Sequence, residues 1–262
     1  MNAFLVSARI AWRTLPESLN WKTAAVRLLG APVFTALFYL ALVSGSGIGR
    51  VTPGDAVAAA LGSGSIVAAV AVATLVAGDR FDGTLPFLFL ATHARATAWL
   101  GRLCVVAGLG VASSTVALVL PFVVTGGPDR LGDWGALVIV LLCSAPATMG
   151  IGWVLGAVSL SLRDALAPAN LAEYVLPLLC GVVVSTTMMP SAVAWVARGF
   201  PLTHVLEAGR VGIAEGLTAS FWNHLGAGLI TGLVWVVLGR FAWAVFVRRV
   251  RRTGTFDGLS AG

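Results

Sequence analysis

Charged residues are scarce in this chain. Of its 262 residues only 11% are Asp, Glu, Lys or Arg, while 58% are apolar. Soluble globular domains carry roughly 25% charged residues, so the scarcity excludes a soluble fold and predicts an all-α integral membrane protein. No polar stretch is long enough to form a separate soluble domain, and we expect one transmembrane domain over residues 1–262.

Lysine, histidine and cysteine are rarer still. The phosphate-binding loop of an ATPase needs a G-x-x-x-x-G-K-[ST] pattern, and the only lysine, Lys22, has no glycine loop before it. The three histidines form no H-E-x-x-H or paired pattern, and the three cysteines all lie inside apolar runs. These patterns exclude an ATPase site within this chain, a metalloprotease site and a disulfide framework. We expect no catalytic, cofactor-binding or metal-binding residue.

Long apolar runs take up most of the chain. A membrane-spanning helix needs about 20 predominantly apolar residues, and six segments meet this condition. Several of them contain Pro or many Gly and Ala residues, which suits close helix packing in lipid. The six expected spans are 24–44, 56–78, 97–125, 134–162, 165–188 and 223–247.

The basic residues fall unevenly on the two sides that these spans define. Thirteen lie on one side and four on the other, and together they make up the 17 in the chain. Cytoplasmic loops carry the excess of Lys and Arg, so we expect both termini in the cytoplasm. The net charge of +6 therefore reflects membrane topology, and nucleic acid is not an expected partner. The four basic residues on the outer side are Arg50, Arg130, Arg198 and Arg210.

Both ends of the chain carry basic residues. In residues 1–23 an apolar helical face is accompanied by Arg9 and Arg13 one turn apart, with Trp12 beside them. This pattern predicts an amphipathic helix along the cytoplasmic leaflet. Residues 248–262 form a basic cytoplasmic tail after the six-span bundle of residues 24–247.

A short apolar segment follows the second span on the cytoplasmic side. It reads "GDRFDGTLPFLFLATHARATAWLGR" (residues 78–102), and its apolar part is too short to cross a membrane. It could lie in the lipid headgroups. It could also be a docking helix for a cytoplasmic partner, rimmed by Asp79, Arg80, Asp82 and Arg95.

The outer connection before the last span is also too apolar for an exposed loop. It contains "SAVAWVARGFPLTHVLEAGRVGIAEGLTAS" (residues 191–220). Backbone at membrane depth must be covered by protein, so this segment predicts one or two short re-entrant helices packed against the spans.

In this order the three pieces resemble the permease subunits of ABC-2-type exporters, and the resemblance covers essentially the whole chain. The stretch after the second span has the family's acidic–Arg–acidic–Gly-Thr pattern and short apolar helix. "GFPLTHVLEAGR" is similar to the family's Pro-Leu-Thr…Arg segment. The N-terminal segment lacks the W-x-x-x-x-P pattern of polysaccharide exporters, which favours a drug or natural-product exporter.

The resemblance implies how the chain works. The N-terminal helix, with Arg9, Trp12 and Arg13, would be the family's connecting helix, and residues Pro201, Leu202, Thr203, Glu207 and Arg210 would belong to its extracellular re-entrant segment. The short cytoplasmic helix would dock into a separate ATPase subunit, present in two copies, which binds ATP and Mg. The residues assigned to ATPase coupling are Asp79, Arg80, Asp82, Gly83, Thr84, Leu85, Phe87, Leu88 and Arg95.

The remaining expectations concern partners and cargo. The chain would pair with a second permease chain, identical or different, and export an amphipathic small molecule, a lipid or a peptide. Its heavy use of Ala, Val, Gly and Arg favours a bacterium with a GC-rich genome, hence the bacterial inner membrane and drug or antibiotic efflux. The alternative is an ATPase-independent secondary carrier or a membrane enzyme. A carrier should show repeated halves and midplane charges, and an enzyme should show clustered His, Asp or Glu.

Two ionisable residues lie well inside the expected spans, Glu173 and Arg240. Each lies about 12 Å from the cytoplasmic edge at 1.5 Å per residue, and charges in lipid are costly. We expect either a pair between the fifth and sixth spans, or two side chains that reach separately for the inner interface.

The topology can be tested by cysteine labelling in intact cells, in a background without the three natural cysteines. An Asp82→Cys variant should react with a membrane-impermeant thiol reagent only after the cells are opened, and an Arg130→Cys variant should react before. The physical reason is the excess of basic residues on the inner side. Labelling of the Asp82→Cys variant from outside would reverse the topology.

Overall fold

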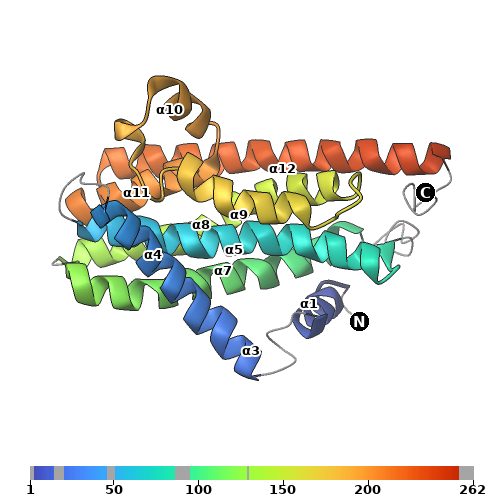
Figure 1. Cartoon of the computed structure of the whole chain (residues 1–262), viewed down its shortest axis with the longest axis horizontal. Helices are drawn as coiled ribbons and strands as arrows, with labels where there is room; N and C mark the ends of the chain where they lie inside the picture. Colours follow the sequence, from blue (N-terminus) through green and yellow to red (C-terminus); the bar gives the residue numbers. More distant parts are fainter. Residues whose placement is uncertain (1–2, 15–20, 46–50, 86–94, 129, 254–262) are drawn as a thin grey trace.

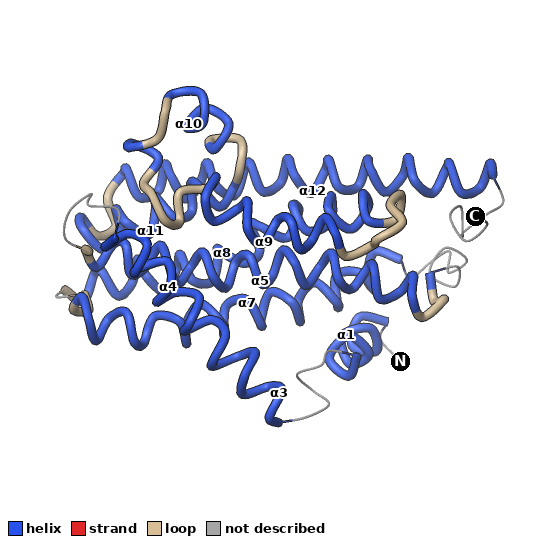
Figure 2. The backbone as a smooth tube through the Cα atoms, in the orientation of Figure 1, coloured by secondary structure: helices blue, strands red, loops and turns tan. Residues whose placement is uncertain are grey.

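The protein is a bundle of helices in a computed structural model. The structure describes all residues except 1–2, 15–20, 46–50, 86–94, 129 and 254–262. Within the described residues every regular element is helical and none is a strand (Figures 1 and 2). The elements are α1 (Ala3–Thr14), α3 (Trp21–Ala25), a π-helical turn η1 (Val26–Gly30), α4 (Ala31–Gly45), α5 (Pro53–Phe81), α7 (Arg95–Thr125), α8 (Leu131–Ser159), α9 (Ala167–Leu179), a 3₁₀ turn η2 (Thr186–Met188), α10 (Ser191–Ala197), α11 (Pro201–Glu215) and α12 (Ala219–Thr253).

Five of the described helices are long and apolar enough to cross a membrane. They contain the segments Leu28–Gly45, Pro53–Phe81, Trp99–Val123, Gly132–Ser159 and Ala219–Arg249. These match the first four expected spans and the last one to within a few residues. α12 runs on to Thr253, so the basic residues before that point belong to a helix and not to a separate tail.

The expected fifth span, 165–188, is wrong in its extent. The structure has instead α9, a helix of 13 residues, which is about 20 Å long where the hydrocarbon core is about 30 Å thick. The helix ends because Gly181 takes a left-handed backbone conformation, with φ at 86°, which glycine adopts at little cost. Hydropathy missed this end because Val182–Val184 continue the apolar run beyond it.

The elements alternate in direction, so each end of the bundle collects defined parts. The C-terminal ends of α5 and α12 and the whole of α1 lie at one end, and α11 lies at the other (Figure 1). We call the first the inner end and the second the outer end, after the topology expected from the basic residues.

α5 is the centre of the bundle. It packs against α4, α7, α8, α9 and α11, and 83% of its span is buried inside the chain, against 22% for α4 and for α12. Its sequence makes this possible because Ala, Gly and Ser fill most positions of "GDAVAAALGSGSIVAAVAVATLVAG". In lipid the hydrophobic effect does not drive helices together, so they associate through close packing. Small residues allow their backbones to approach closely.

Glycines mark the closest backbone contacts. A Cβ atom on Gly64 of α5 would overlap the carbonyl oxygen of Gly110 and the Ser114 hydroxyl of α7. A Cβ atom on Gly152 of α8 would overlap the carbonyl oxygen of Ala69 on α5. At these points the helices therefore touch through their backbones, and α7 and α8 are fixed on two sides of α5.

Large apolar side chains cover the outside of the bundle. α12 exposes Ile230, Leu233, Val237 and Phe241, and other rows lie on α4, α7 and α9. Such a continuous apolar exterior is costly in water and suits lipid or another membrane helix.

Replacing Gly64 by Ala tests the backbone contact. The added methyl group has no space against the α7 backbone, so we expect a loss of stability of about 1–3 kcal/mol, the range seen for overpacked cores. A Cβ atom on Gly78 of the same helix would meet nothing within 4 Å, so Gly78→Ala should be neutral or stabilising by up to about 1 kcal/mol. Thermal unfolding in detergent measures both, and equal midpoints for the two variants would contradict this packing.

Candidate functional site

Two groups of polar residues lie at the two ends of α5. The outer group begins at the N-terminus of this helix, where Thr52 and Asp55 cap each other. The Asp55 backbone N–H donates to the Thr52 hydroxyl (3.3 Å), and the Thr52 backbone N–H donates to the Asp55 carboxylate (3.0 Å). Pro53 occupies the first helical turn, where a missing N–H costs nothing. This capping box fixes where α5 starts and points a carboxylate toward α11.

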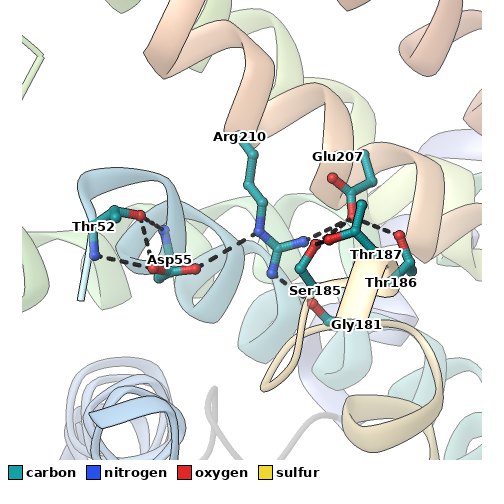
Figure 3. Close-up of polar contacts among 8 residues, drawn as sticks. All are labelled: Thr52, Asp55, Gly181, Ser185, Thr186, Thr187, Glu207 and Arg210. Carbon is teal, nitrogen blue, oxygen red and sulfur yellow. Dashed lines mark hydrogen bonds and ion pairs between the residues drawn. The ribbon is translucent and has the colours of Figure 1, made fainter. Parts of the chain in front are cut away.

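Arg210 of α11 bridges that carboxylate to the end of α9 (Figure 3). Its Nε atom lies 3.9 Å from Asp55, one terminal nitrogen donates to Glu207 at 3.2 Å, and the other donates to the Gly181 carbonyl at 2.6 Å. The Arg210 side chain is only 14% exposed. One guanidinium thus contacts α5, α11 and the turn after α9.

Glu207 extends the same network into that turn. Its carboxylate accepts from the Thr186 hydroxyl at 2.9 Å and from the Ser185 hydroxyl at 3.4 Å (Figure 3). The bonds satisfy polar groups that would otherwise be costly at this depth. We call these residues the outer network: Thr52, Asp55, Gly181, Ser185, Thr186, Glu207 and Arg210.

The helices between α9 and α12 are held by further contacts. The buried Thr203 hydroxyl donates to the Ala197 carbonyl at 2.7 Å, which joins α11 to α10. Trp235 of α12 stacks on Phe200 and donates from its indole N–H to the Gly199 carbonyl at 2.8 Å. α11 also packs between α5, α8 and α12. The connection therefore forms two short helices, α10 and α11, of which α11 is covered by protein.

The sequence-predicted residues of this region divide into two sets. Glu207 and Arg210 lie in the outer network, whereas Pro201, Leu202 and Thr203 form the buried first turn of α11. Asp55, which lies 3.9 Å from Arg210, was not among the predicted residues. The signal was present, because "VTPGD" combines Thr three residues before an acidic residue with Pro at the first helical turn.

The inner group begins with a mostly buried ion pair between Asp79 of α5 and Arg102 of α7. Asp79 also accepts from the Thr84 hydroxyl at 3.1 Å. The Arg102 guanidinium lies 5.6 Å from the centre of the Trp99 ring, close enough for a cation–π contact. The pair therefore holds together α5 and α7, the two helices that the segment between them connects.

Arg80 reaches from α5 in another direction. It donates to the carbonyl oxygens of Ser159 (3.1 Å), the last residue of α8, and of Leu162 (2.6 Å), three residues beyond it. The last carbonyls of a helix have no partner within the helix, and a cation there is favoured by the helix dipole. Arg80 thus ties α8 to α5.

These contacts contradict the prediction that Asp79 and Arg80 lie at the rim of a docking helix. Asp79 and Arg80 are directed into the bundle, and Leu85 is buried in an apolar cluster with Val76, Trp243 and others. The reason is that each polar group finds a partner inside the bundle and so does not remain at its surface. Asp82, Gly83 and Thr84 form an exposed turn after α5, and Arg95 begins α7. Phe87 and Leu88 lie outside the described residues.

Three tryptophans from three helices pack beside this clamp. The Trp99 ring of α7 stacks on Trp153 of α8, with centroids 6.0 Å apart, and meets Trp243 of α12 edge-on at 5.4 Å. The inner ends of these helices are therefore joined by aromatic contacts as well as by charges. We call Asp79, Arg80, Arg102, Trp99, Trp153 and Trp243 the inner clamp.

The connecting-helix residues lie on α1. Arg9, Trp12 and Arg13 are exposed, while Ser7 and Ala11 are buried, as an amphipathic helix requires. α1 packs on the start of α7, where a Cβ atom on Gly101 would overlap Ser7 and the Phe4 backbone.

The expected pair of Glu173 and Arg240 is not formed within the chain. Both side chains are exposed, and the described part of the chain records no ion pair between them. α9 packs on α5 and α8, whereas α12 packs on α8 and α11. Of the two arrangements expected, the pair is the one not formed, because similar depth does not bring two helices side by side.

Comparison with known proteins gives one family. The family model for the ABC-2 type transporter matches residues 9–214, which run from within α1 to the last turn of α11 and include Arg210. No curated protein matches the chain. Among the described residues, no three His, Cys, Asp or Glu side chains gather as metal ligands would.

Arg210→Gln tests the outer network. The change leaves the Asp55 and Glu207 carboxylates without their cation in a mostly buried place, so we expect a loss of about 2 kcal/mol. Arg198→Gln, at an exposed arginine just after α10, is the matched control and should change little. Thermal unfolding in detergent measures both, and an unchanged midpoint for Arg210→Gln would show that the network adds no stability.

Proposed function

Because the chain belongs to the ABC-2 type transporter family, we propose that it is the membrane subunit of an ATP-driven exporter. Two copies of a separate ATPase subunit would bind at its inner end. A second permease chain, identical or closely related, would complete the transport path. The assembly would lie in a bacterial inner membrane with both termini of this chain in the cytoplasm.

The inner clamp is the observation that supports this proposal best. The cytoplasmic segment between α5 and α7 is held at both ends, because Asp79 before it pairs with Arg102 after it. Arg80 connects the same place to α8. A force applied to the segment by an ATPase would therefore move α5, α7 and α8 together instead of bending a loose loop. Such linkage is what a transport subunit without its own energy source needs.

α1 provides a second surface for the same partner. Its exposed face carries Arg9, Trp12 and Arg13, and its buried face sits on the start of α7. An ATPase in contact with both α1 and the cytoplasmic segment would hold α7 at two points. In this arrangement the apolar part of the segment, with Phe87 and Leu88, is the anchor, since buried apolar side chains dominate binding energy.

The outer network lies at the opposite end of α5 from the inner clamp. α5 reaches from the inner clamp to Asp55, which faces Arg210. Movement of α5 along or about its axis would therefore act on α11 and on the turn after α9. The cargo would be an amphipathic small molecule, lipid or peptide that reaches the path from the cytoplasm or the inner leaflet.

Phe87→Asp combined with Leu88→Asp tests the partner. A buried carboxylate in an apolar contact is strongly unfavourable, so the ATPase subunit should no longer co-purify with the tagged permease in mild detergent. Met188→Asp, which changes an exposed apolar residue at the outer end, is the control and should retain the partner. All variants should insert in the membrane to equal levels. Undiminished co-purification with the double variant would refute docking at this segment.

A further inference from the structure

Glu173 is an acidic residue on an apolar surface. It lies in the middle of α9 and is exposed, and Leu171, Tyr174 and Leu178 beside it are exposed by 65%, 74% and 61%. The opposite side of α9, with Ala169, Ala172 and Leu176, is buried, and α9 runs alongside α5 (Figure 1). The carboxylate therefore points away from the packed side of its helix.

Its depth lies between the two polar ends of the bundle. Glu173 comes nine residues after Asp164, which follows the inner end of α8, and eight residues before Gly181 of the outer network. At a rise of about 1.5 Å per residue, each distance is on the order of 12–14 Å. Glu173 is thus placed near the middle of the expected hydrocarbon layer.

Lipid is a poor neighbour for a carboxylate at this depth. A charged group at the centre of a bilayer costs several kcal/mol, and such residues normally face water, a partner charge or a pathway. The Glu side chain is too short to reach either polar end from here. Within the described chain no cation pairs with it. No described residue of this chain therefore balances the charge.

The neighbouring residues favour an organic cation. Tyr39 of α4 belongs to the same buried apolar cluster as Ala172 and Leu176 of α9, and the Phe38 ring lies 6.2 Å from the Tyr39 ring. Phe38 and Tyr174 are both largely exposed. Aromatic faces attract cations and also bind apolar groups, so one carboxylate and several rings offer what an amphipathic cation requires.

We propose that Glu173 is the cation-binding residue of the transport path and that the surface formed by α9 and the neighbouring part of α4 binds amphipathic organic cations. The proposal builds on the proposed function and specifies its substrate class. Glu173 contacts the cationic group, while Tyr174 and Phe38 contact the apolar part of the same molecule. Neutral or anionic molecules of the same size gain no such contact.

Two ions of nearly equal size and opposite charge provide the test. Tetraphenylphosphonium and tetraphenylborate both enter membranes, so binding is measured with the purified full chain in lipid nanodiscs, by equilibrium dialysis against empty nanodiscs. The wild-type chain should bind the phosphonium ion in a saturable way and the borate ion only as empty nanodiscs do. Glu173→Gln, which keeps the size of the side chain, should weaken phosphonium binding by roughly tenfold.

Glu215→Gln is the matched control. Glu215 is exposed at the end of α11, and its replacement changes the net charge by the same amount, so phosphonium binding should stay at the wild-type level. Equal phosphonium binding by the wild type and Glu173→Gln, or no saturable binding at all, overturns the proposal. Lower oligomeric mass of Glu173→Gln with unchanged phosphonium binding also overturns it and assigns the carboxylate to a contact between copies. Co-purification of the ATPase, measured on the same samples, reports separately on the proposed function.

Discussion

The close approach of helix backbones around α5 is the constraint on which the rest of the structure depends. Gly64 of α5 lies against the backbone of α7, and Gly152 of α8 lies against the backbone of α5. Since the hydrophobic effect does not drive helices together in lipid, dense packing of small residues must hold them together. Once α7 and α8 are fixed on α5, the ends of these helices have defined neighbours, and polar groups there can be paired.

The polar residues then form two layers, one at each end of α5. At the outer end Arg210 joins three elements through a carboxylate, a carbonyl and its own helix. At the inner end Asp79 and Arg80 connect α5 to α7 and α8. A polar group in low dielectric is costly when unpaired, so both layers resist separation of their helices. α5 runs between the two layers and carries a residue of each, Asp55 in the outer one and Asp79 in the inner one.

Sequence reasoning located these layers but assigned some residues to the wrong surface. Asp79 and Arg80 were expected at the rim of a docking helix, yet they turn inward and find partners on α7 and α8. Successive residues at a helix end point about 100° apart, so position along the chain does not say which side chain faces a neighbour. The same limit explains Glu173 and Arg240, which have similar depth but lie on helices that pack on different partners.

By itself the sequence determined that the chain is a membrane protein of the ABC-2 type, where its long helices lie and which of its ends carry positive charge. These properties follow from local composition, because each span and each cap is decided by residues close together in the chain. The tertiary structure decided that α9 stops before Gly181, that Asp55 meets Arg210 and that Glu173 forms no ion pair with the other described residues. Such outcomes depend on the angles and distances at which helices cross, which arise only when residues far apart in the chain pack together.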